Sequence, residues 1–454
     1  MEKNDTAEVR IEDIAEDGQG IGRAGGYTLF IKDAVPGDLV EVKVIKAKKN
    51  YGYARILRMI EPSPDRVEPR CPVAGPCGGC QLQAMSYESQ LEFKRRKIEN
   101  HLKRIGGFSD ITVPPVIGME DPFHYRNKAQ YPVGRSKDGK ILMGFYAGRT
   151  HSIIETGHCY LGQPVNDEIL KLIREYMEEN RVEPYDEERH SGLVRHVLIR
   201  VGYHTGEIMV CLVINGRRLP AVHQLKEKLL TVKGMSCISL CVNQEKSNVI
   251  LGEKLINLYG PGYITDRIGD IRYQISPLSF YQVNPQQTEK LYGKALEFAG
   301  LKGGEVVWDL YCGIGTISLF LARKAKRVYG VEIVPAAVEN AKKNARINGI
   351  ANAEFYVGKA EDVLPEMYRQ KGVSADVIVV DPPRAGCDEV LLDTIVKMAP
   401  QRVVYVSCDS ATLARDLRWL CDRGYEIGGV QGVDMFGQTV HVETVCLMSR
   451  VEGK

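Results

Sequence analysis

The clearest pattern in the chain is an alternation of strand-like and helix-like segments from about residue 285 onward. "EVVWDLYC" (305–312) is an apolar run, and "TISLFLARKA" (316–325) has helical periodicity. The pair recurs as "RVYGVEI" and "PAAVENAKKNARING", whose Pro335 and Gly349 mark a helix start and end. "AEFYVGKA", "ADVIVVDPP" and "RVVYVSC" are three further strands separated by helical patterns. Repeated strand–helix units predict an α/β domain with a parallel, doubly wound sheet.

The first part of the chain, residues 1–62, has short β-prone runs between Gly, Asp and Pro turns, which predicts a small β-barrel. Lys43 to Arg58 contains six basic residues and no acidic one, with Tyr51 and Tyr53 among them. Basic groups with interleaved aromatic rings are typical of single-stranded nucleic-acid binding. A strand edge protected by lysines is the alternative. The segment resembles a TRAM domain, a small RNA-binding barrel found in several RNA-modifying enzymes.

Between these two regions the pattern is mixed. "EPSPDRVEPRCP" (61–72) is rich in proline and charge, which indicates an extended linker. A basic helical stretch, "ESQLEFKRRKIENHLKRIGG", then precedes strand-like runs such as "HVLIRVGYHTGEIMVCLVING", so we predict an α+β fold there. The predicted division is therefore a barrel at 1–62, a central α+β domain at 63–275 and the α/β domain at 276–454.

Composition narrows the class of protein. The 454 residues have ordinary composition and a net charge of only +2, so charge alone does not indicate a nucleic-acid partner. The acidic N-terminus lacks the apolar run of a signal peptide, and no stretch approaches the roughly 20 apolar residues that span a bilayer. We therefore expect a cytosolic, monomeric protein without a membrane segment. Its twelve cysteines are then metal, catalytic or core residues rather than disulfides.

A cofactor site is predicted at the first strand–helix turn, "DLYCGIGTISL" (309–319). Glycines allow a sharp turn and a close approach to a ligand. Glu332 ends the next strand, 23 residues after Asp309, which is the usual place for a carboxylate that binds a ribose hydroxyl. Ser318 stands where a dinucleotide-binding loop has its third glycine, which favours S-adenosylmethionine over NAD. A tight turn beside a surface glutamate is the alternative.

Two more strands end in chemically useful residues. "VVDPPRAG" (379–386) places Asp381 at a strand end and follows it with two conformationally restricted prolines. Cys408 follows the strand in "RVVYVSC", where it is a core residue, a metal ligand or a nucleophile. Ligands of open α/β sheets bind at the carboxyl ends of the strands. Four polar residues are expected at that edge: Asp309, Glu332, Asp381 and Cys408.

A cysteine cluster precedes this domain. "CPVAGPCGGC" contains Cys71, Cys77 and Cys80, and Cys159 follows later in the chain. Four thiolates are able to hold zinc or a [4Fe–4S] cluster, with His158 as a rival ligand and unliganded core cysteines as the alternative. The remaining cysteines are interpreted mostly as packing residues: Cys211, Cys237, Cys241, Cys312, Cys387, Cys421 and Cys446.

Five motifs resemble, in order, those of the RNA uracil-C5 methyltransferase family: "SPLSFYQVNPQQTEKLY", "DLYCGIGTISL", "VVDPPRAG", "VSCDSATLARDL" and "DMFGQTVHVETV". The resemblance spans roughly 276–450 and implies a Rossmann-like class I methyltransferase domain. It implies methyl transfer from S-adenosylmethionine to uridine C5 through a covalent adduct between Cys408 and C6, with Glu443 as the base. The residues implied to contact S-adenosylmethionine are Gln282, Tyr311, Glu332 and Asp381.

The large-subunit rRNA branch of this family carries a [4Fe–4S] cluster in the arrangement seen here. The resemblance therefore implies that Cys71, Cys77, Cys80 and Cys159 hold such a cluster and that 23S rRNA is the substrate. Two departures are visible. Asp409–Ser410 replaces the Asn-Pro that often follows the cysteine, and Gly437 stands where family members often have proline. Both departures put the rigidity of loops in doubt more than activity.

Three alternatives remain open. A tRNA uridine is the nearest, because it requires the same chemistry. A radical enzyme that reduces S-adenosylmethionine needs a cluster beside the cofactor, whereas these cysteines precede the cofactor motifs by some 150 residues. A non-catalytic RNA-binding assembly factor would not need Cys408 and Glu443. The basic stretches "KRRK" (94–97) and "HYRNK" (124–128) lead us to expect that the cluster region helps to position RNA.

Overall fold

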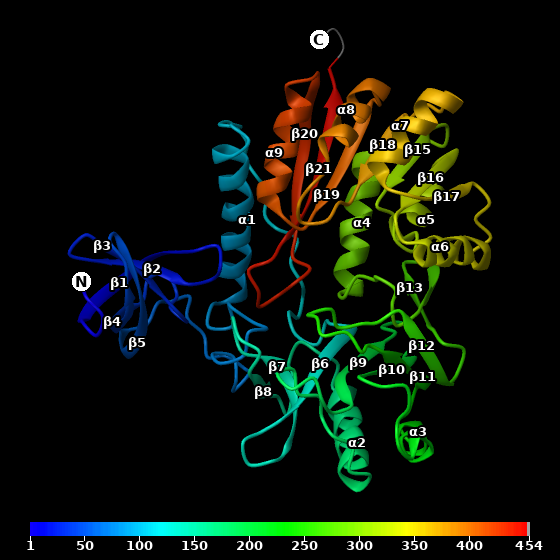
Figure 1. Cartoon of the computed structure of the whole chain (residues 1–454). Helices are drawn as coiled ribbons and strands as arrows, with labels where there is room; N and C mark the ends of the chain where they lie inside the picture. The colour runs from blue at the N-terminus through cyan, green and yellow to red at the C-terminus, as the bar shows by residue number, and fades with distance from the viewer. Residues whose placement is uncertain (452–454) are drawn as a thin grey trace.

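The computed structural model describes residues 1–451, which form an N-terminal barrel, a central sheet and a C-terminal α/β layer structure (Figure 1). The barrel is closed in the order β1-β2-β3-β5-β4. Its alternating apolar residues point inward; Val9, Leu29 and Val42 are at most 1% exposed. This confirms the predicted β-barrel. Its strands are β1 (Thr6–Ile14), β2 (Gly20–Ala24), β3 (Tyr27–Ile31), β4 (Leu39–Ala47) and β5 (Tyr51–Glu61).

The central part is a seven-stranded sheet in the order β12-β11-β10-β9-β6-β7-β8. Helices α2 (Val165–Glu179) and α3 (Val222–Leu230) pack on one face of it. The other face packs toward the C-terminal part, and Cys211 and Cys237 are buried in its apolar core, as predicted. The strands are β6 (Lys128–Arg135), β7 (Ile141–Tyr146), β8 (Ile153–Glu155), β9 (Val194–Val201), β10 (Ile208–Ile214), β11 (Met235–Val242) and β12 (Lys254–Tyr259).

The hairpin β13 (Ile264–Ile268) and β14 (Ile271–Ile275) leads to a second seven-stranded sheet in the order β17-β16-β15-β18-β19-β21-β20. Five of its strands are parallel, which confirms the predicted doubly wound architecture: β15 (Val306–Leu310), β16 (Arg327–Glu332), β17 (Ala353–Val357), β18 (Val377–Val380) and β19 (Arg402–Ser407). The final strands, β20 (Tyr425–Val433) and β21 (Glu443–Arg450), are antiparallel additions.

Helices cover both faces of this sheet (Figure 1). One face carries α4 (Pro285–Ala299), α5 (Thr316–Ala322) and α6 (Pro335–Ile347). The other face carries α7 (Ala360–Lys371), α8 (Glu389–Met398) and α9 (Ser410–Cys421). Pro285 and Pro335 occupy the first turns of α4 and α6, where the missing N–H costs no hydrogen bond.

Helix α1 (Tyr87–Arg104) lies in the segment expected to belong to the central domain, yet it packs beside α9 against the C-terminal sheet. Its Ile98 and Leu102 are fully buried there. The "KRRK" stretch, interpreted from the sequence as basic surface near a region that positions RNA, lies on this helix, and its Lys94 does not reach the surface. That lysine is fully buried in an ion pair with Asp434, 2.7 Å from Nζ to Oδ1.

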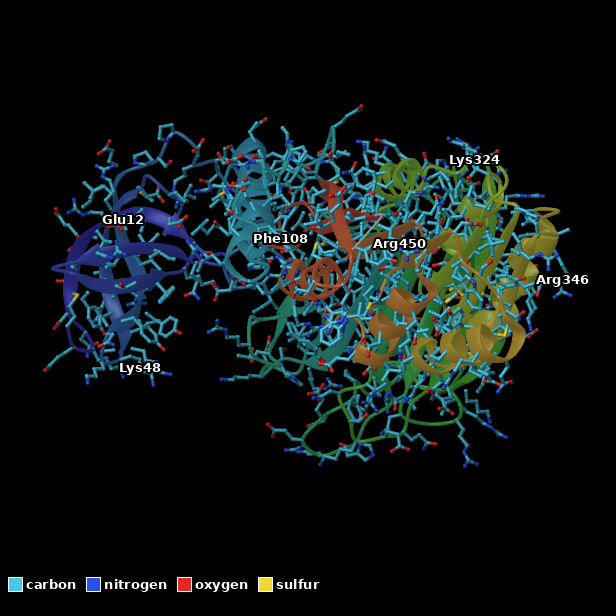
Figure 2. All side chains as sticks on the ribbon, turned by 90° about the horizontal axis from the view of Figure 1, so that it is seen from above. Glu12, Lys48, Phe108, Lys324, Arg346 and Arg450 are labelled. Carbon is cyan, nitrogen blue, oxygen red and sulfur yellow. The ribbon has the colours of Figure 1, made fainter. Side chains whose placement is uncertain are left out.

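The barrel is docked onto this helix. Ile14 and Val35 of the barrel share an apolar cluster with Phe93 of α1 and Val440 of the β20–β21 connection. From above, the barrel carrying Glu12 and Lys48 projects to one side, and α1 lies between it and the α/β domain (Figure 2). Within residues 1–451, no helix is both long enough and apolar enough to cross a membrane.

Candidate active site

A cavity of about 840 Å³ opens at the carboxyl ends of β15, β16, β18 and β19. This is the edge at which ligands of open α/β sheets bind. All six residues assigned from the sequence to catalysis or cofactor binding line it: Gln282, Tyr311, Glu332, Asp381, Cys408 and Glu443. The six side chains therefore share one cavity.

The turn after β15 is shaped by left-handed backbone. Tyr311, Gly313 and Gly315 have φ of 68°, 55° and 81°. A Cβ on Gly315 would lie 3.2 Å from Phe355 of β17, so this position has little room for a side chain. Gly313 also lines the cavity, and a Cβ added to it would have no atom within 4 Å. The turn therefore leaves bare backbone facing the cavity at Gly313.

Glu332 is held by this turn. Its Oε2 accepts a hydrogen bond from the Gly313 N–H at 3.1 Å, and its Oε1 accepts one from the Val334 N–H at 2.8 Å. Each carboxylate oxygen retains acceptor capacity toward the cavity. A carboxylate fixed in this way at the end of the second strand fits the two hydroxyls of a ribose.

Asp309, on β15, is a second carboxyl at this edge. Ser318 of α5 donates a hydrogen bond to its Oδ2. Burial raises the pKa of Asp309 to about 7, and its Oδ1 has no hydrogen-bond partner among the described residues. A buried acceptor without a partner is costly, and a ligand with a donor group would satisfy it.

Gln282 reaches the cavity from the segment before α4. Asn127 of the central domain fixes that segment, because its side-chain amide donates to the Gln282 carbonyl at 2.9 Å and its N–H donates to Val283 at 2.8 Å. The buried Gln282 side chain then lines the cavity. The central domain therefore positions one wall of this site.

Cys408 and Glu443 meet because of strand register. Ser407, the last residue of β19, pairs with Thr444 of antiparallel β21. The next residues outward along the two strands are Cys408 and Glu443. Cys408 is partly exposed, and Asp409 after it caps α9 by accepting from the Ala411 N–H at 2.9 Å. The cysteine is therefore accessible and held between a strand end and a capped helix.

Burial and the negative charges at this end of the cavity raise the pKa values of Cys408 and Glu443. Burial, together with the negative charges of Glu443 and Asp381, raises the pKa of the Cys408 thiol to about 11. Burial, and secondarily Asp381, raises the pKa of Glu443 to about 8. Arg384 opposes both shifts, so its cation acts on the cysteine and the glutamate together. A glutamate with such a pKa is suited to general-base work near neutral pH.

Four other lining residues were not predicted from the sequence to belong to this cavity: Arg126, Arg384, Phe436 and His441. Arg384 was visible in "VVDPPRAG" and Arg126 in "HYRNK", but no spacing signal linked them to the site. The guanidinium of Arg126 lies 5.9 Å from the Phe436 ring centroid, and Phe436 meets His441 edge to face at 6.2 Å. These aromatic rings and cations suit the stacking of a flat heterocyclic base.

The four expected metal ligands lie near one another but apart from this cavity. All four are free thiols. Burial raises the pKa of Cys80 to about 12, and Cys159, Cys77 and Cys71 add to that shift. His158, the rival ligand, instead pairs with Asp167 at 2.5 Å. Within the described residues, no group of three or more His, Cys, Asp or Glu side chains is arranged to hold a metal ion, so the expected cluster has no support from a recognisable ligand set.

Known protein families and relatives match nearly the whole chain. The family model for tRNA (uracil-5-)-methyltransferase matches residues 86–451, and the TRAM domain model matches residues 2–57. An uncharacterized RNA methyltransferase from Halalkalibacterium halodurans is 54% identical over 449 residues, covering 99% of this chain and 98% of that protein. One from Clostridium tetani is 50% identical over 450 residues, covering 99% and 97%.

A solved structure is also similar. The tRNA (uracil-54, C5)-methyltransferase of Pyrococcus abyssi, in complex with S-adenosyl-L-homocysteine, superposes with a TM-score of 0.77 at 30% identity. The alignment covers 97% of this chain and 99% of that protein. The likeness therefore includes the barrel, the central sheet and the α/β domain.

Proposed function

Because the chain belongs to the tRNA (uracil-5-)-methyltransferase family of S-adenosylmethionine-dependent RNA methyltransferases, we propose that it methylates C5 of specific uridines through a covalent adduct with Cys408. The family expected from the motifs is thus confirmed. One observation carries the mechanism: a single cavity contains an accessible cysteine and a buried glutamate beside a glycine turn and a fixed carboxylate. That set matches what the reaction needs at each stage.

The proposed reaction begins at the uracil ring, whose C5 is a weak nucleophile. Addition of the Cys408 thiolate to C6 turns the ring into an enolate, which makes C5 reactive. Arg384 lines the cavity and its charge acts on both Cys408 and Glu443, so it would help to stabilise the negative charge that develops. S-adenosylmethionine supplies the electrophilic methyl group that C5 takes.

The second half of the reaction restores the aromatic ring. After C5 carries the methyl group, Glu443 removes the remaining C5 proton, and the electrons of that C–H bond form the C5–C6 double bond as the Cys408–C6 bond breaks. The sulfur leaves as a thiolate. With a pKa of about 8, Glu443 is in the range in which a carboxylate both accepts and releases this proton readily.

For the cofactor, we propose contacts from the four residues implied by the motifs. Glu332 would accept hydrogen bonds from ribose hydroxyls, since two backbone N–H groups already orient it. Tyr311, Gln282 and Asp381 line the same cavity and would bind the remainder of the molecule.

For the RNA, we propose 23S rRNA as the substrate and the cytoplasm as the site of action. A base inside a duplex is unreachable, so the uridine must lie in a loop or flip out. The cysteine pattern resembles the rRNA branch and supports this choice. A tRNA uridine is the second candidate, favoured by the whole-chain likeness to the Pyrococcus abyssi tRNA enzyme.

The test maps 5-methyluridine in 23S rRNA and in tRNA from cells with and without the gene. We expect a uridine in 23S rRNA to lose its methyl group and to regain it with the wild-type gene but not with Cys408→Ala. Loss confined to tRNA would select the second candidate. Unchanged methylation of both RNAs would overturn the proposal, as would rescue by the alanine variant.

We also propose that Cys71, Cys77, Cys80 and Cys159 hold a [4Fe–4S] cluster. The supporting observations are the four free, mutually interacting thiols and the Pro/Gly loop around them. A cluster separates its ligands more widely than a single ion does. Methyl transfer from a sulfonium moves no net electron, so the cluster's role would be to order loops that lack an apolar core.

A further inference from the structure

Four polar side chains lie along one face of α1: Gln90, Lys94, Lys97 and His101. Their spacing of four, three and four residues places them on a single stripe of the helix. We call this stripe the α1 polar face. All four make a hydrogen bond to the two segments that carry the proposed reacting groups. The stripe is therefore part of the support of the active site, although it lies more than 300 positions earlier in the chain.

Three members of the α1 polar face hold the β20–β21 connection, residues 434–442, which ends at Glu443. Lys94 Nζ donates to Asp434 Oδ1 at 2.7 Å and to the Phe436 carbonyl at 3.2 Å. Gln90 and Gln438 exchange two hydrogen bonds, each of 3.0 Å. Lys97 donates to the Val440 carbonyl at 3.3 Å. These bonds fix the segment that brings Phe436, His441 and Glu443 to the cavity.

The fourth member, His101, has two partners on different parts of the molecule. Its Nδ1 lies 2.8 Å from Ser410 Oγ, and its Nε2 lies 2.7 Å from Glu16 Oε1. An ionised carboxylate only accepts, so Nε2 donates to Glu16. In the neutral ring Nδ1 is then an acceptor, and the Ser410 hydroxyl donates to it. His101 thus joins the barrel to a residue two positions after Cys408.

Ser410 makes this connection possible. It opens α9 directly after the cap residue Asp409, and it is 3% exposed. It occupies one of the two positions after the cysteine at which this chain departs from the Asn-Pro of many relatives. Proline has no hydroxyl group and could not donate to His101. The departure, which raised doubt about loop rigidity, is therefore offset by a side-chain hydrogen bond.

On the barrel side, Glu16 belongs to the β1–β2 connection, which packs closely on the same region. A Cβ added to Gly18 in that connection would lie 3.1 Å from Val440 Cγ1. Burial lowers the pKa of Lys97, and the negative charges of Glu16 and Asp409 both oppose that shift. The barrel and the segment that carries Cys408 therefore both face the middle of α1. A shift of the barrel would be transmitted to both segments.

We propose that α1 couples the barrel to the reacting groups, with His101 as the positioning residue that links Glu16 to the Cys408 segment. The inference rests on the proposed function, because it takes the barrel as an RNA-binding part and Cys408 as the nucleophile. RNA held on the barrel then sets the position of Cys408 relative to the uridine that it must attack. Small displacements of a reacting atom cost about a hundredfold in rate, so such a link matters for turnover.

The first test uses the substrate-free protein and does not depend on methylation. Glu16→Ala breaks the barrel end of the link. Glu12→Ala is its matched control, because Glu12 is an exposed barrel carboxylate whose ion pair is with Arg23 of the same barrel. Amide hydrogen exchange is followed in the peptide covering 407–417. We expect faster exchange there for Glu16→Ala and wild-type exchange for Glu12→Ala. Unchanged exchange in Glu16→Ala would overturn the inference.

The second test separates the two bonds of His101 by amide variants. His101→Asn keeps a polar atom near the Nδ1 position facing Ser410, and His101→Gln reaches toward the Nε2 position facing Glu16. With unmodified 23S rRNA and tRNA transcripts, each variant should lower the single-turnover rate about tenfold or more while the RNA concentration for half-maximal rate stays within about twofold. A rise in that concentration with an unchanged rate would mean that His101 only helps to bind RNA.

A double-variant cycle completes the test. If Glu16 and Ser410 act through one relay, Glu16→Ala combined with Ser410→Ala should be no slower than the worse single variant. If the rate loss of the double variant equals the product of the two single losses, the two residues act independently, which would contradict the relay. If wild type methylates neither transcript, the proposed function fails, while the hydrogen-exchange result still decides whether the barrel orders the 407–417 segment.

Discussion

Lys94 and Asp434 form an ion pair of 2.7 Å in which both side chains are fully buried, although 340 positions separate them in the chain. Asp434 also accepts a hydrogen bond from the Tyr87 hydroxyl at 2.8 Å. A buried pair of this kind contributes less to net stability than its geometry suggests, because both charges lose their hydration. It does tie the first helix to the segment that ends at Glu443.

Breaking this pair should be costly. Lys94→Met leaves the Asp434 carboxylate buried without its cation, which destabilises proteins by about 3–5 kcal/mol. The matched control is Lys103→Met on the same helix, where the lysine is partly exposed and pairs with Glu99, so we expect a change below about 1 kcal/mol. Thermal unfolding of both variants measures the difference. Equal melting temperatures for Lys94→Met and the control would contradict the structural importance of the pair.

The parts that were predictable from the sequence are those encoded locally. Strand–helix alternation predicted the parallel strands, and the rule that their carboxyl ends meet placed Asp309, Glu332, Asp381 and Cys408 at one edge. Glu443 was recognised through a motif, and its position opposite Cys408 follows from the register of β19 and β21. Neither local pattern nor composition defined that register.

The parts that were not predictable depend on contacts between distant segments. Nothing in "KRRK" distinguishes Lys94, which is fully buried, from Arg96, which is half-exposed. The pairing of α1 with α9 and of the barrel with Val440 joins segments that lie hundreds of residues apart in the chain, so no local sequence pattern encodes it. Arg126 enters the cavity lining from a loop of the central domain for the same reason.

The reactivity of Cys408 should depend on pH in a defined way. Its raised pKa of about 11 means that its alkylation by iodoacetamide should increase about tenfold per pH unit from pH 7 toward 10. In the wild type, Glu443 is negatively charged above about pH 8, and burial together with that charge raises the pKa of Cys408. Glu443→Gln removes the charge and should therefore lower the pKa of Cys408 at high pH. The variant should therefore react faster than wild type at pH 9–10 and similarly at pH 6–7. Peptide mass spectrometry, with Cys408→Ser as blank, checks this; a slower variant at pH 9–10 would contradict the charge coupling.

Glu443→Gln should also separate the two halves of the reaction. The nucleophile is intact, so methyl transfer to C5 should proceed, but removal of the C5 proton should slow by about 10²–10⁴-fold. The methylated covalent adduct with ordinary RNA should accumulate and be visible by denaturing electrophoresis. Turnover at the wild-type rate would exclude Glu443 as the base.

The cysteine cluster has its own test. Protein purified without oxygen should contain about four iron atoms and four labile sulfides per chain. Cys80→Ser should lose the iron and lower stability or RNA affinity, with S-adenosylmethionine binding retained. Cys421→Ser, which changes a partly exposed cysteine of α9, is the control and should keep the iron. Iron-free wild-type protein would refute the cluster.

The redox state of that cluster should not matter for the chemistry. Single-turnover methylation should proceed at the same rate with the cluster oxidised or reduced, as long as iron is retained. A rate that follows cluster reduction, or deoxyadenosine among the products, would instead support a radical mechanism.

The most direct test of the central claim uses RNA that contains 5-fluorouridine at the methylated position. Fluorine cannot leave C5 as a cation, so the reaction should stop at the methylated adduct with the sulfur still bonded to C6. Tandem mass spectrometry of the digested complex should find the modified nucleotide on Cys408, and Cys408→Ala should bind S-adenosylmethionine but form no adduct. An adduct on another residue, or the same adduct with Cys408→Ala, would contradict the account.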